Sequence, residues 1–233
     1  MEFTFGIITD GTNDSKIELI IDSVEKLEIP KYEIIIVGNS NIDRKNTSII
    51  EFDENIKPKW ITKKKNIITE NSKYENIVYS HDYISYSEDW YKGFLKYGND
   101  FKACMTRIIN YDNQRYRDWI SSFNSFSLDE WINQYSSEWS QRHRVIPYDL
   151  KHLSKYMYFS GAYWVSKKYI MEEIPLNEDL CWGECEDLDW SFKYRSKYEF
   201  SINHYSTVKL LKQKDRVFNL ANDNDIEKFI NMD

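Results

Sequence analysis

A short acidic stretch around residue 186 contains the densest group of side chains that could act as bases. Four carboxylates fall within six positions there: Glu184, Glu186, Asp187 and Asp189. A helix beginning near Glu184 would hold them in its first turns, where free backbone N–H groups and the helix dipole favour negative charge. An aspartate ionises at about pH 3.9 when unperturbed, so it can accept a proton at neutral pH. The stretch therefore predicts either a catalytic base or an ordinary acidic helix start.

The two residues that precede these acids, Trp182 and Gly183, add a second chemical feature. Trp182 offers a flat aromatic surface, and Gly183 lets another backbone approach closely. A tryptophan beside a carboxylate is typical of sites that bind sugars or other flat polar ligands. This pairing favours the interpretation as a catalytic site over that of a charged helix surface.

A second candidate group stands at the end of an apolar run, residues 77–80, that reads as a buried strand. The run ends in His81-Asp82, which would place an imidazole and a carboxylate at the edge of the sheet. Asp82 could supply a hard oxygen, and His81 a nitrogen that Mn²⁺ accepts better than Mg²⁺. The alternative is a polar strand end that leads into a helix over residues 88–97.

The elements that must position these groups begin with a strand at residues 3–9. A capping box at Ser15 and Glu18 predicts the start of a helix, and residues 32–37 form a second apolar strand. A strand-helix-strand order implies a right-handed crossover and a parallel pair. Ligands bind beyond the carboxyl ends of parallel strands, here residues 9–11 and 38–40.

Later elements are less sharply marked. Lys63, Lys64 and Lys65 are expected on a solvated face, with a phosphate-facing group at a helix start as the alternative. The other expected elements are strands at 49–52, 60–62, 103–106, 156–165 and 200–204, helices at 66–73 and 127–136, a short helix from 166, and a tail helix after 216.

Composition limits the classes of partner. The chain has 233 residues and a formal net charge of −7, which argues against nucleic acid or an anionic membrane as partner. No apolar run approaches the ~20 residues of a membrane span. The N-terminus does not resemble a signal peptide. Three cysteines without a regular framework favour a reducing, cytoplasmic location, and buried thiols are favoured over zinc for Cys181 and Cys185.

The common phosphate-binding loops are missing from the sequence. No Gly-x-Gly-x-x-Gly follows the first strand, and there is no Gly-Lys-Ser/Thr loop. If the sheet binds a nucleotide, another group must neutralise the phosphates, and a metal is the first candidate.

The order of these features resembles the family 2 glycosyltransferases, which have the GT-A fold. The resemblance covers roughly residues 3–210 and rests on the opening strand, the strand-turn at 33–40, Asn66 sixteen residues before Asp82, the segment 77–82, the strand carrying Gly161, and Trp182-Gly183-x-x-Glu186-Asp187-x-Asp189.

This resemblance implies an α/β fold with a mixed, mostly parallel central sheet flanked by helices. The expected organisation is a single domain over 1–215 and a peripheral tail over 216–233. Within the domain, 1–110 would be the nucleotide-sugar half, and 111–215 the acceptor half with a partly helical insert at 112–156. The expected reaction moves a sugar from a nucleotide-diphosphate sugar, with a UDP-sugar as the expected donor, to a glycan or other hydroxyl acceptor.

The resemblance also assigns roles by position. Asp187 would be the base of an inverting displacement, with Glu186 beside it orienting acceptor hydroxyls. Trp182 and Gly183 would contact the acceptor, and a divalent metal, Mn²⁺ or Mg²⁺, would be held by Asp82 and His204. The residues expected to bind the nucleotide sugar are Thr9, Asp10, Gly11, Asn39, Asn66, His81, Asp82 and Gly161.

Two departures from the family pattern keep alternatives open. The metal motif lacks its second aspartate, and the second strand ends in Gly38-Asn39 where an acidic contact is usual. A GT-A-like module that binds a nucleotide or glycan without chemistry is therefore the main alternative. A sugar nucleotidyltransferase would need a glycine-rich N-terminal signature, for which residues 9–12 are a poor substitute. A retaining mechanism, a purely structural His204 and an insert that only covers the sheet also remain open.

Overall fold

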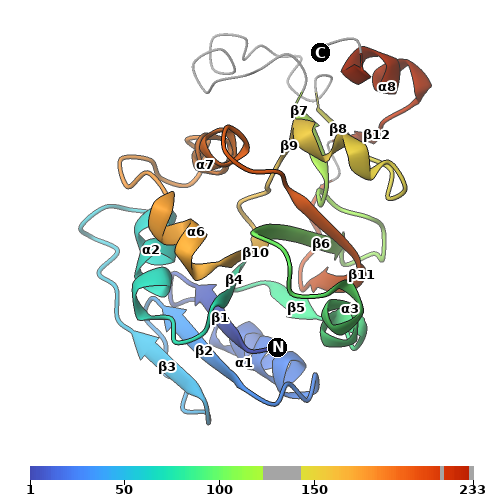
Figure 1. Cartoon of the computed structure of the whole chain (residues 1–233). Coiled ribbons are helices and arrows are strands. Elements are labelled where there is room, and N and C mark those ends of the chain that lie inside the picture. Colours follow the sequence, from blue (N-terminus) through green and yellow to red (C-terminus); the bar gives the residue numbers. More distant parts are fainter. Residues whose placement is uncertain (123–142, 216–217, 231–233) are drawn as a thin grey trace.

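The computed structural model describes residues 1–122, 143–215 and 218–230, and a large mixed sheet runs through its centre (Figure 1). Its eight strands follow the order β3-β2-β1-β4-β10-β6-β11-β5, and four of its seven pairings are parallel. The strands are β1 Phe3–Ile8, β2 Tyr32–Val37, β3 Thr47–Ile50, β4 Asn76–His81, β5 Ile84–Tyr86, β6 Ala103–Ile109, β10 Tyr163–Lys167 and β11 Ser201–Leu210. The expected single α/β domain with a mixed, mostly parallel sheet is confirmed.

The chain opens with the predicted parallel strand-helix-strand unit. All six residues of β1 are buried, and helix α1 (Asp14–Glu25) packs through Ile17, Ile20, Ile21 and Val24. The capping box does not form. The helix begins one residue before Ser15, with Asn13 at its N-cap. The Asn13 side chain makes no capping hydrogen bond, and its amide donates to Asp82.

Alternation along β1 places helices on both faces of the sheet. Phe3 and Phe5 pack against Trp90 of α3 (Asp89–Tyr97), with ring centroids 5.0 and 5.3 Å away. Gly6 points to the other face, where a Cβ would overlap Ile68 of α2 (Ile61–Asn71). The glycine therefore lets α2 lie directly on the strand. Helices α2, α6 (Lys168–Glu173) and α7 (Glu186–Arg195) gather above the sheet in Figure 1, and α1 and α3 lie below it.

A small second sheet supports α7. Its strands are ordered β12-β8-β7-β9, with bounds β7 Ile120–Ser122, β8 His143–Val145, β9 Met157–Tyr158 and β12 Asn219–Leu220. Leu188 and Phe192 of α7 pack with Ile120, Val145 and Tyr158 in one apolar cluster. A short 3-10 helix, η1 (Lys151–Tyr156), precedes β9, and α8 (Asp223–Ile230) is the predicted tail helix. This packing holds the start of α7, with its carboxylates, against the main sheet.

Three expected elements were wrong. Residues 60–62 are not a strand: α2 begins at Ile61, five residues earlier than predicted, because its first turn packs under the 176–180 segment. The expected strand 156–165 is divided between β9 and β10, which belong to different sheets, with Gly161 in the turn between them. The late strand continues past His204 to Leu210 as β11, with a register shift between Asn203 and Thr207. The helix predicted at 127–136 lies outside the described residues.

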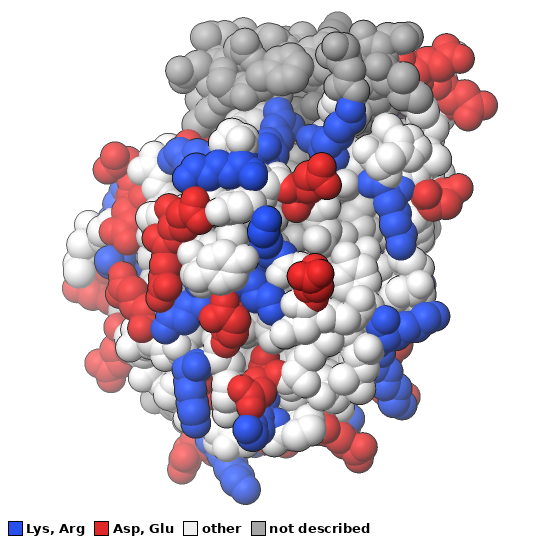
Figure 2. Space-filling model, in the orientation of Figure 1, with Lys and Arg blue, Asp and Glu red and all other residues white. Residues whose placement is uncertain are grey.

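Two general findings bear on partners. None of the described helices is both long enough and apolar enough to cross a membrane. Both signs of charge are interspersed over the coloured part of the face in Figure 2, so this face offers no continuous basic surface of the kind that nucleic acids need.

Candidate functional site

The carboxyl ends of β1 and β4 meet through three side chains. Asp82 follows β4, and its Oδ2 accepts hydrogen bonds from Thr9 Oγ1 at 2.9 Å and Asn13 Nδ2 at 3.0 Å. Parallel pairing of β1 with β4 brings Ile8 opposite His81, which sets Thr9 beside Asp82. The carboxylate is therefore buried at the ligand edge of the sheet and already has two donors.

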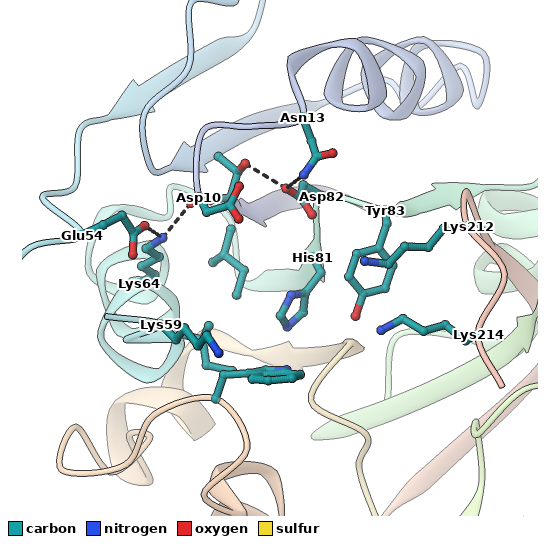
Figure 3. Close-up of a pocket in the computed structure, with 14 residues that line it drawn as sticks. Asp10, Asn13, Glu54, Lys59, Lys64, His81, Asp82, Tyr83, Lys212 and Lys214 are labelled. Atoms are coloured by element: carbon teal, nitrogen blue, oxygen red, sulfur yellow. Dashed lines mark hydrogen bonds and ion pairs between the residues drawn. The ribbon is translucent and has the colours of Figure 1, made fainter. Parts of the chain in front are cut away.

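A pocket of about 340 Å³ opens at this edge (Figure 3). Its walls come from five parts of the chain: the β1–α1 turn, the start of α2 with the segment before it, the end of β4, the segment around residue 182 and the segment around residue 213. The residues that line it are Ile8, Thr9, Asp10, Asn13, Glu54, Lys59, Ile61, Lys64, His81, Asp82, Tyr83, Trp182, Lys212 and Lys214. This volume suits part of a polar small molecule.

Four lysines line the pocket, and they differ in their partners. Lys64 is buried, donates to the Thr9 carbonyl at 2.6 Å and forms an ion pair with Glu54. Lys59, Lys212 and Lys214 have no carboxylate partner within the described residues. Lys212 and Lys214 instead lie over the ring of Tyr83, at 4.0 and 4.7 Å from its centroid. Among the described residues, these three ammonium groups thus have no carboxylate within ion-pair distance.

His81 lies at the centre of the pocket in Figure 3 and is electrically neutral. Its backbone N–H donates to the Ala162 carbonyl at 3.1 Å. Burial lowers its pKa well below the usual value, and the nearby lysines, Lys65 first among them, lower it further. The imidazole is thus uncharged at pH 7 and adds no positive charge to the lysines.

The predicted acidic stretch forms the start of α7. Asp187 accepts hydrogen bonds from the N–H of Gly161 at 2.8 Å and of Leu188 at 2.9 Å. Burial raises the pKa of Asp187, against the effect of the Gly161 hydrogen bond. Burial and then the neighbouring Asp187 raise the pKa of Glu186 to about 7. These are environments that make a carboxylate a stronger base.

Gly161 fits closely against both carboxylates. A Cβ at this position would lie 3.0 Å from Glu186 Oε1 and 3.3 Å from Asp187 Oδ2. On the other side, Lys65 Nζ donates to the Gly161 carbonyl at 2.7 Å. The turn at Gly161-Ala162 therefore joins the pocket, through His81, to the candidate base.

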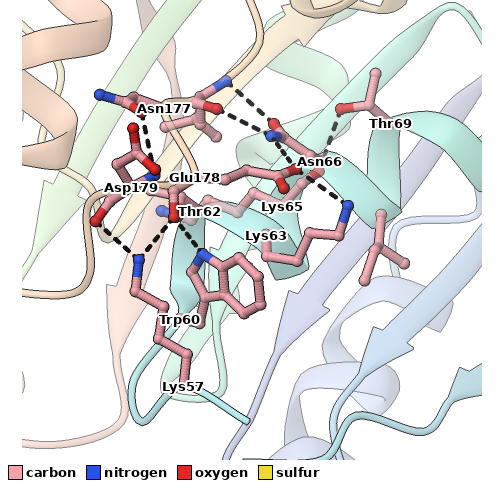
Figure 4. A network of polar contacts seen from close by, with 12 residues as sticks. Lys57, Trp60, Thr62, Lys63, Lys65, Asn66, Thr69, Asn177, Glu178 and Asp179 are labelled. Carbon is pink, nitrogen blue, oxygen red and sulfur yellow. Dashed lines mark hydrogen bonds and ion pairs between the residues drawn. The ribbon is translucent and has the colours of Figure 1, made fainter.

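A polar clamp fixes the segment that leads to Trp182 (Figure 4). Lys57 Nζ and Trp60 Nε1 both donate to the Glu178 carbonyl, at 2.8 and 2.6 Å. Thr62 Oγ1 donates to the Leu180 carbonyl at 2.7 Å, and the Trp182 N–H donates to the Lys59 carbonyl at 3.1 Å. Trp182 itself stays 54% exposed at the pocket rim, with Lys59 Nζ 4.9 Å from its ring centroid.

The structure brings some sequence-predicted site residues together and separates others. Five of them line the pocket: Thr9, Asp10, His81, Asp82 and Trp182. Glu186, Asp187 and Gly161 form the adjoining acidic group. Gly11, in a left-handed conformation (φ +86°), and Asn39 pack together behind the pocket, where a Cβ on Gly11 would lie 2.9 Å from the Asn39 carbonyl. Gly183 lies in the exposed turn before α7.

Two other predicted residues lie elsewhere. The Asn66 amide donates to the Leu176 carbonyl at 3.0 Å and to Glu178 at 2.9 Å, so it belongs to the clamp. His204 lies beside Tyr205 on β11, with ring centroids 4.0 Å apart, and does not line the pocket. Neither residue is in position to contact a ligand at Asp82 in this arrangement.

Sequence reasoning missed the lysines after β11. Lys212 and Lys214 are two residues apart shortly after the long strand β11, and that spacing puts two side chains on the same side of an extended segment. It also missed Asn13, Glu54, Lys59 and Tyr83 as pocket residues. Lys64 agrees with the alternative for the lysine triplet, because it lines the pocket. Lys65 is buried, and Lys63 is ion-paired with Glu178 at 3.1 Å.

The donor set does not fit a divalent cation. Hard cations of this kind need several oxygen ligands. Asp82 Oδ2 is hydrogen-bonded, and Asp10 Oδ1 accepts from the N–H and hydroxyl of Thr12 at 3.0 and 2.6 Å. Among the described residues, no group of three His, Cys, Asp or Glu could hold a metal. The positions two before and two after Asp82 are Ser80 and Ile84, both buried within strands.

Comparison with known proteins identifies the fold. No protein-family model and no curated protein matches the sequence. Among solved structures, the S. aureus TarS 1–349 fragment has a TM-score of 0.55 at 12% identity, covering 89% of this chain and 60% of that one. The same fragment in complex with UDP-GlcNAc has a TM-score of 0.55 at 11% identity, covering 93% and 60%. GalNAc-T7 with UDP, GalNAc and Mn²⁺ has a TM-score of 0.61 at 12% identity, covering 99% and 47%.

The chain thus spans about half to three fifths of the length of these neighbours. The neighbours are GT-A glycosyltransferases, and membership of family 2 stays a prediction. The mixed sheet, the strand-end pocket and these similarities together show that the chain has the fold of a GT-A glycosyltransferase.

Proposed function

We propose that this protein is a glycosyltransferase that moves a sugar from a nucleotide-diphosphate sugar, with UDP as the favoured nucleotide, to a hydroxyl group of a glycan or another acceptor. One observation carries the proposal: a single turn connects the pocket to the candidate base. Ala162 accepts from His81 at the pocket, and the adjacent Gly161 donates to Asp187. A leaving-group site and a proton acceptor are therefore held in fixed relation, as a displacement requires.

The donor would lie across the ends of β1 and β4, with its diphosphate in the lysine-lined pocket. Residues 1–110 would form most of the donor side and 111–215 the acceptor side, although Lys212 and Lys214 come from the second half. Trp182 at the rim would stack on the acceptor or on the transferred sugar. The neighbours that contain UDP or UDP-GlcNAc support a UDP-sugar as the donor class.

The proposed step is an inverting displacement. The acceptor oxygen attacks the anomeric carbon as Asp187 takes the hydroxyl proton. The new carbon–oxygen bond forms as the bond from the anomeric carbon to the phosphate oxygen breaks, and the nucleoside diphosphate leaves with that electron pair. Glu186 would orient the acceptor hydroxyl. The raised pKa of Asp187 favours proton transfer to it.

A non-catalytic module that binds a nucleotide or glycan is the second candidate, and the single carboxylate at the metal-motif position favours it. One experiment separates the two. UDP release is measured from UDP-glucose, UDP-galactose, UDP-GlcNAc and UDP-GalNAc, with a panel of mono- and disaccharide acceptors, beside thermal shifts with UDP, GDP, CDP and dTDP. Release stimulated by an acceptor supports the transferase. Nucleotide binding without release from any donor would assign the binding module instead.

A further inference from the structure

We propose that lysine ammonium groups, and not a divalent metal, neutralise the donor diphosphate in this protein. Lys212 and Lys214 on one wall and Lys59 on the opposite wall would contact the two phosphoryl groups. The inference rests on the proposed function, because it names how that same pocket binds a nucleoside diphosphate.

The first step is the failure of the site to fit a metal. GT-A neighbours include one with UDP and Mn²⁺. Here, Asp82 is the one carboxylate at the end of β4, and its Oδ2 already accepts hydrogen bonds from Thr9 and Asn13. The nearest carboxylate on the adjoining turn, Asp10, is taken up by Thr12. Glu54, the third carboxylate that lines the pocket, is ion-paired with Lys64, and no group of three His, Cys, Asp or Glu among the described residues could hold a metal.

The second step is the arrangement of the unpaired lysines. Figure 3 shows Lys212 and Lys214 extending toward Tyr83 from one side of the pocket and Lys59 entering from the other. The Nζ atoms of Lys212 and Lys214 lie 4.0 and 4.7 Å from the centroid of the Tyr83 ring. The Lys59 chain runs beside the ring of Trp182. Aromatic contacts direct these flexible chains into the pocket while leaving their charge available for an anion.

The third step is the balance of charge. Lys64 and Glu54 form an ion pair, so together they add no net charge to the pocket. The net charge is therefore set by the other charged residues that line it. Lys59, Lys212 and Lys214 then face Asp10 and Asp82, whose oxygens are partly occupied by internal hydrogen bonds. An ammonium group binds phosphate oxygens strongly through charge-assisted hydrogen bonds. Three such groups from two walls can enclose a diphosphate.

The consequence for the reaction concerns the leaving group. As the bond from the anomeric carbon to the phosphate oxygen breaks, negative charge grows on the diphosphate. Lys212, Lys214 and Lys59 would stabilise that charge where a Lewis acid does so in metal-dependent enzymes. The acceptor proton goes to Asp187, so the three lysines take no part in the proton transfer and the step remains balanced.

The test compares UDP with uridine as probes of the full chain. Dissociation constants are measured by calorimetry in EDTA, in Mg²⁺ and in Mn²⁺. We expect the UDP affinity to agree within about twofold among the three conditions. We expect K212M/K214M to weaken UDP binding by about tenfold or more, with uridine binding unchanged. K209M is the matched control, because Lys209 lies near the end of β11, shortly before these two lysines, but donates to Asn113 outside the pocket.

The outcomes separate this inference from the proposed function. UDP binding that requires Mn²⁺ or Mg²⁺ and survives K212M/K214M would overturn the lysine assignment and leave the glycosyltransferase intact. Equal loss of UDP and uridine binding in the double variant would also overturn it, because that loss would not depend on phosphate. If the wild type binds neither UDP nor another nucleoside diphosphate under any condition, both proposals fail.

Discussion

Lys65 Nζ lies 2.7 Å from the carbonyl oxygen of Gly161. This hydrogen bond joins α2 to the Gly161 turn, whose N–H donates to the candidate base, Asp187. The lysine is fully buried, with Nζ 4.4 Å from the ring centroid of Trp164. Burial lowers its pKa to about 8, and the charges of Glu186 and Asp187 oppose this shift. Lys65 is therefore a structural link between α2 and the Gly161 turn. It is also a buried cation whose charge acts on Glu186 and Asp187.

Lys65→Met should move the acid limb of the pH–rate profile to higher pH. The lysine lowers the pKa of Glu186 and of Asp187, so its removal raises both, and a base with a higher pKa is protonated up to a higher pH. The measurement is kcat against pH for transfer from the active UDP-sugar. Lys63→Met removes a neighbouring lysine that pairs with Glu178 in the clamp, and its profile should match the wild type. If the acid limb of the Lys65→Met profile stays at the wild-type pH, Lys65 has no electrostatic effect on the base.

Asp187→Asn should keep nucleotide affinity and lose transfer by about 10²–10⁴-fold, because an amide cannot accept the proton. Both carboxylate oxygens accept backbone hydrogen bonds, and asparagine retains only one acceptor, so we also expect a small loss of stability. Turnover and UDP affinity are measured together. Asp189→Asn is the control on the same helix, where the carboxylate pairs with Lys193 and not with the turn. Wild-type turnover in Asp187→Asn would exclude this residue as the base.

Glu186→Gln should stabilise the fold more at pH 8 than at pH 5. The pKa of Glu186 is raised to about 7 in the folded state from 4.5, so the folded state binds more protons than the unfolded state between these values. Wild-type stability therefore falls as the pH rises through this window, and glutamine removes that loss. The difference is on the order of 1–3 kcal/mol. Urea unfolding at both pH values measures it, and Glu184→Gln, at an exposed position, should show no such difference.

Trp182→Ala should raise the KM for the acceptor by a larger factor than it weakens UDP binding, to which the ring contributes only through its contact with Lys59. The ring is half exposed at the pocket rim, so its removal should change the free energy of unfolding by less than about 0.5 kcal/mol. Initial rates are measured at varied acceptor concentration. Tyr111→Ala, which removes an equally exposed ring that does not line the pocket, should leave both constants unchanged. An unchanged acceptor KM in Trp182→Ala would argue against stacking.

Sequence patterns predicted the parts of the fold that depend on local periodicity. Residues 3–8, 14–25 and 32–37 carry apolar residues at strand and helix spacing, and they form the expected unit. The helix with Glu186 and Asp187 in its first turn was also predicted, within two residues. The start of α2 at Ile61 was missed because residues 60–62 are bulky or β-branched, and tertiary contacts to residues 178–180 override that preference.

The site was less readable than the fold. A lysine triplet looks solvated in sequence, yet Lys64 and Lys65 are buried because backbone carbonyls of distant segments, at Thr9 and Gly161, accept hydrogen bonds from their ammonium groups. Lys212 and Lys214 reach the pocket only because β11 pairs with β6 and β5 on the far side of the sheet. Such contacts between distant segments depend on the strand order of the sheet, which local sequence patterns do not reveal. The predicted roles of Asn66 and His204 assumed spacing from the family, and here their side chains face other partners.

The strand order has a consequence for how the chain folds during synthesis. β10 lies between β4 and β6, and β11 lies between β6 and β5, although β1 to β6 all come from the first 109 residues. A ribosome that has released only those residues has made six strands that cannot form one continuous sheet. The edges of β4 and β6 stay unpaired until residues 163–210 emerge, and such edges are sites of aggregation. The sheet formed by the first 109 residues is therefore completed only when residues 163–210 have been made, and fragments that end before β10 should be insoluble.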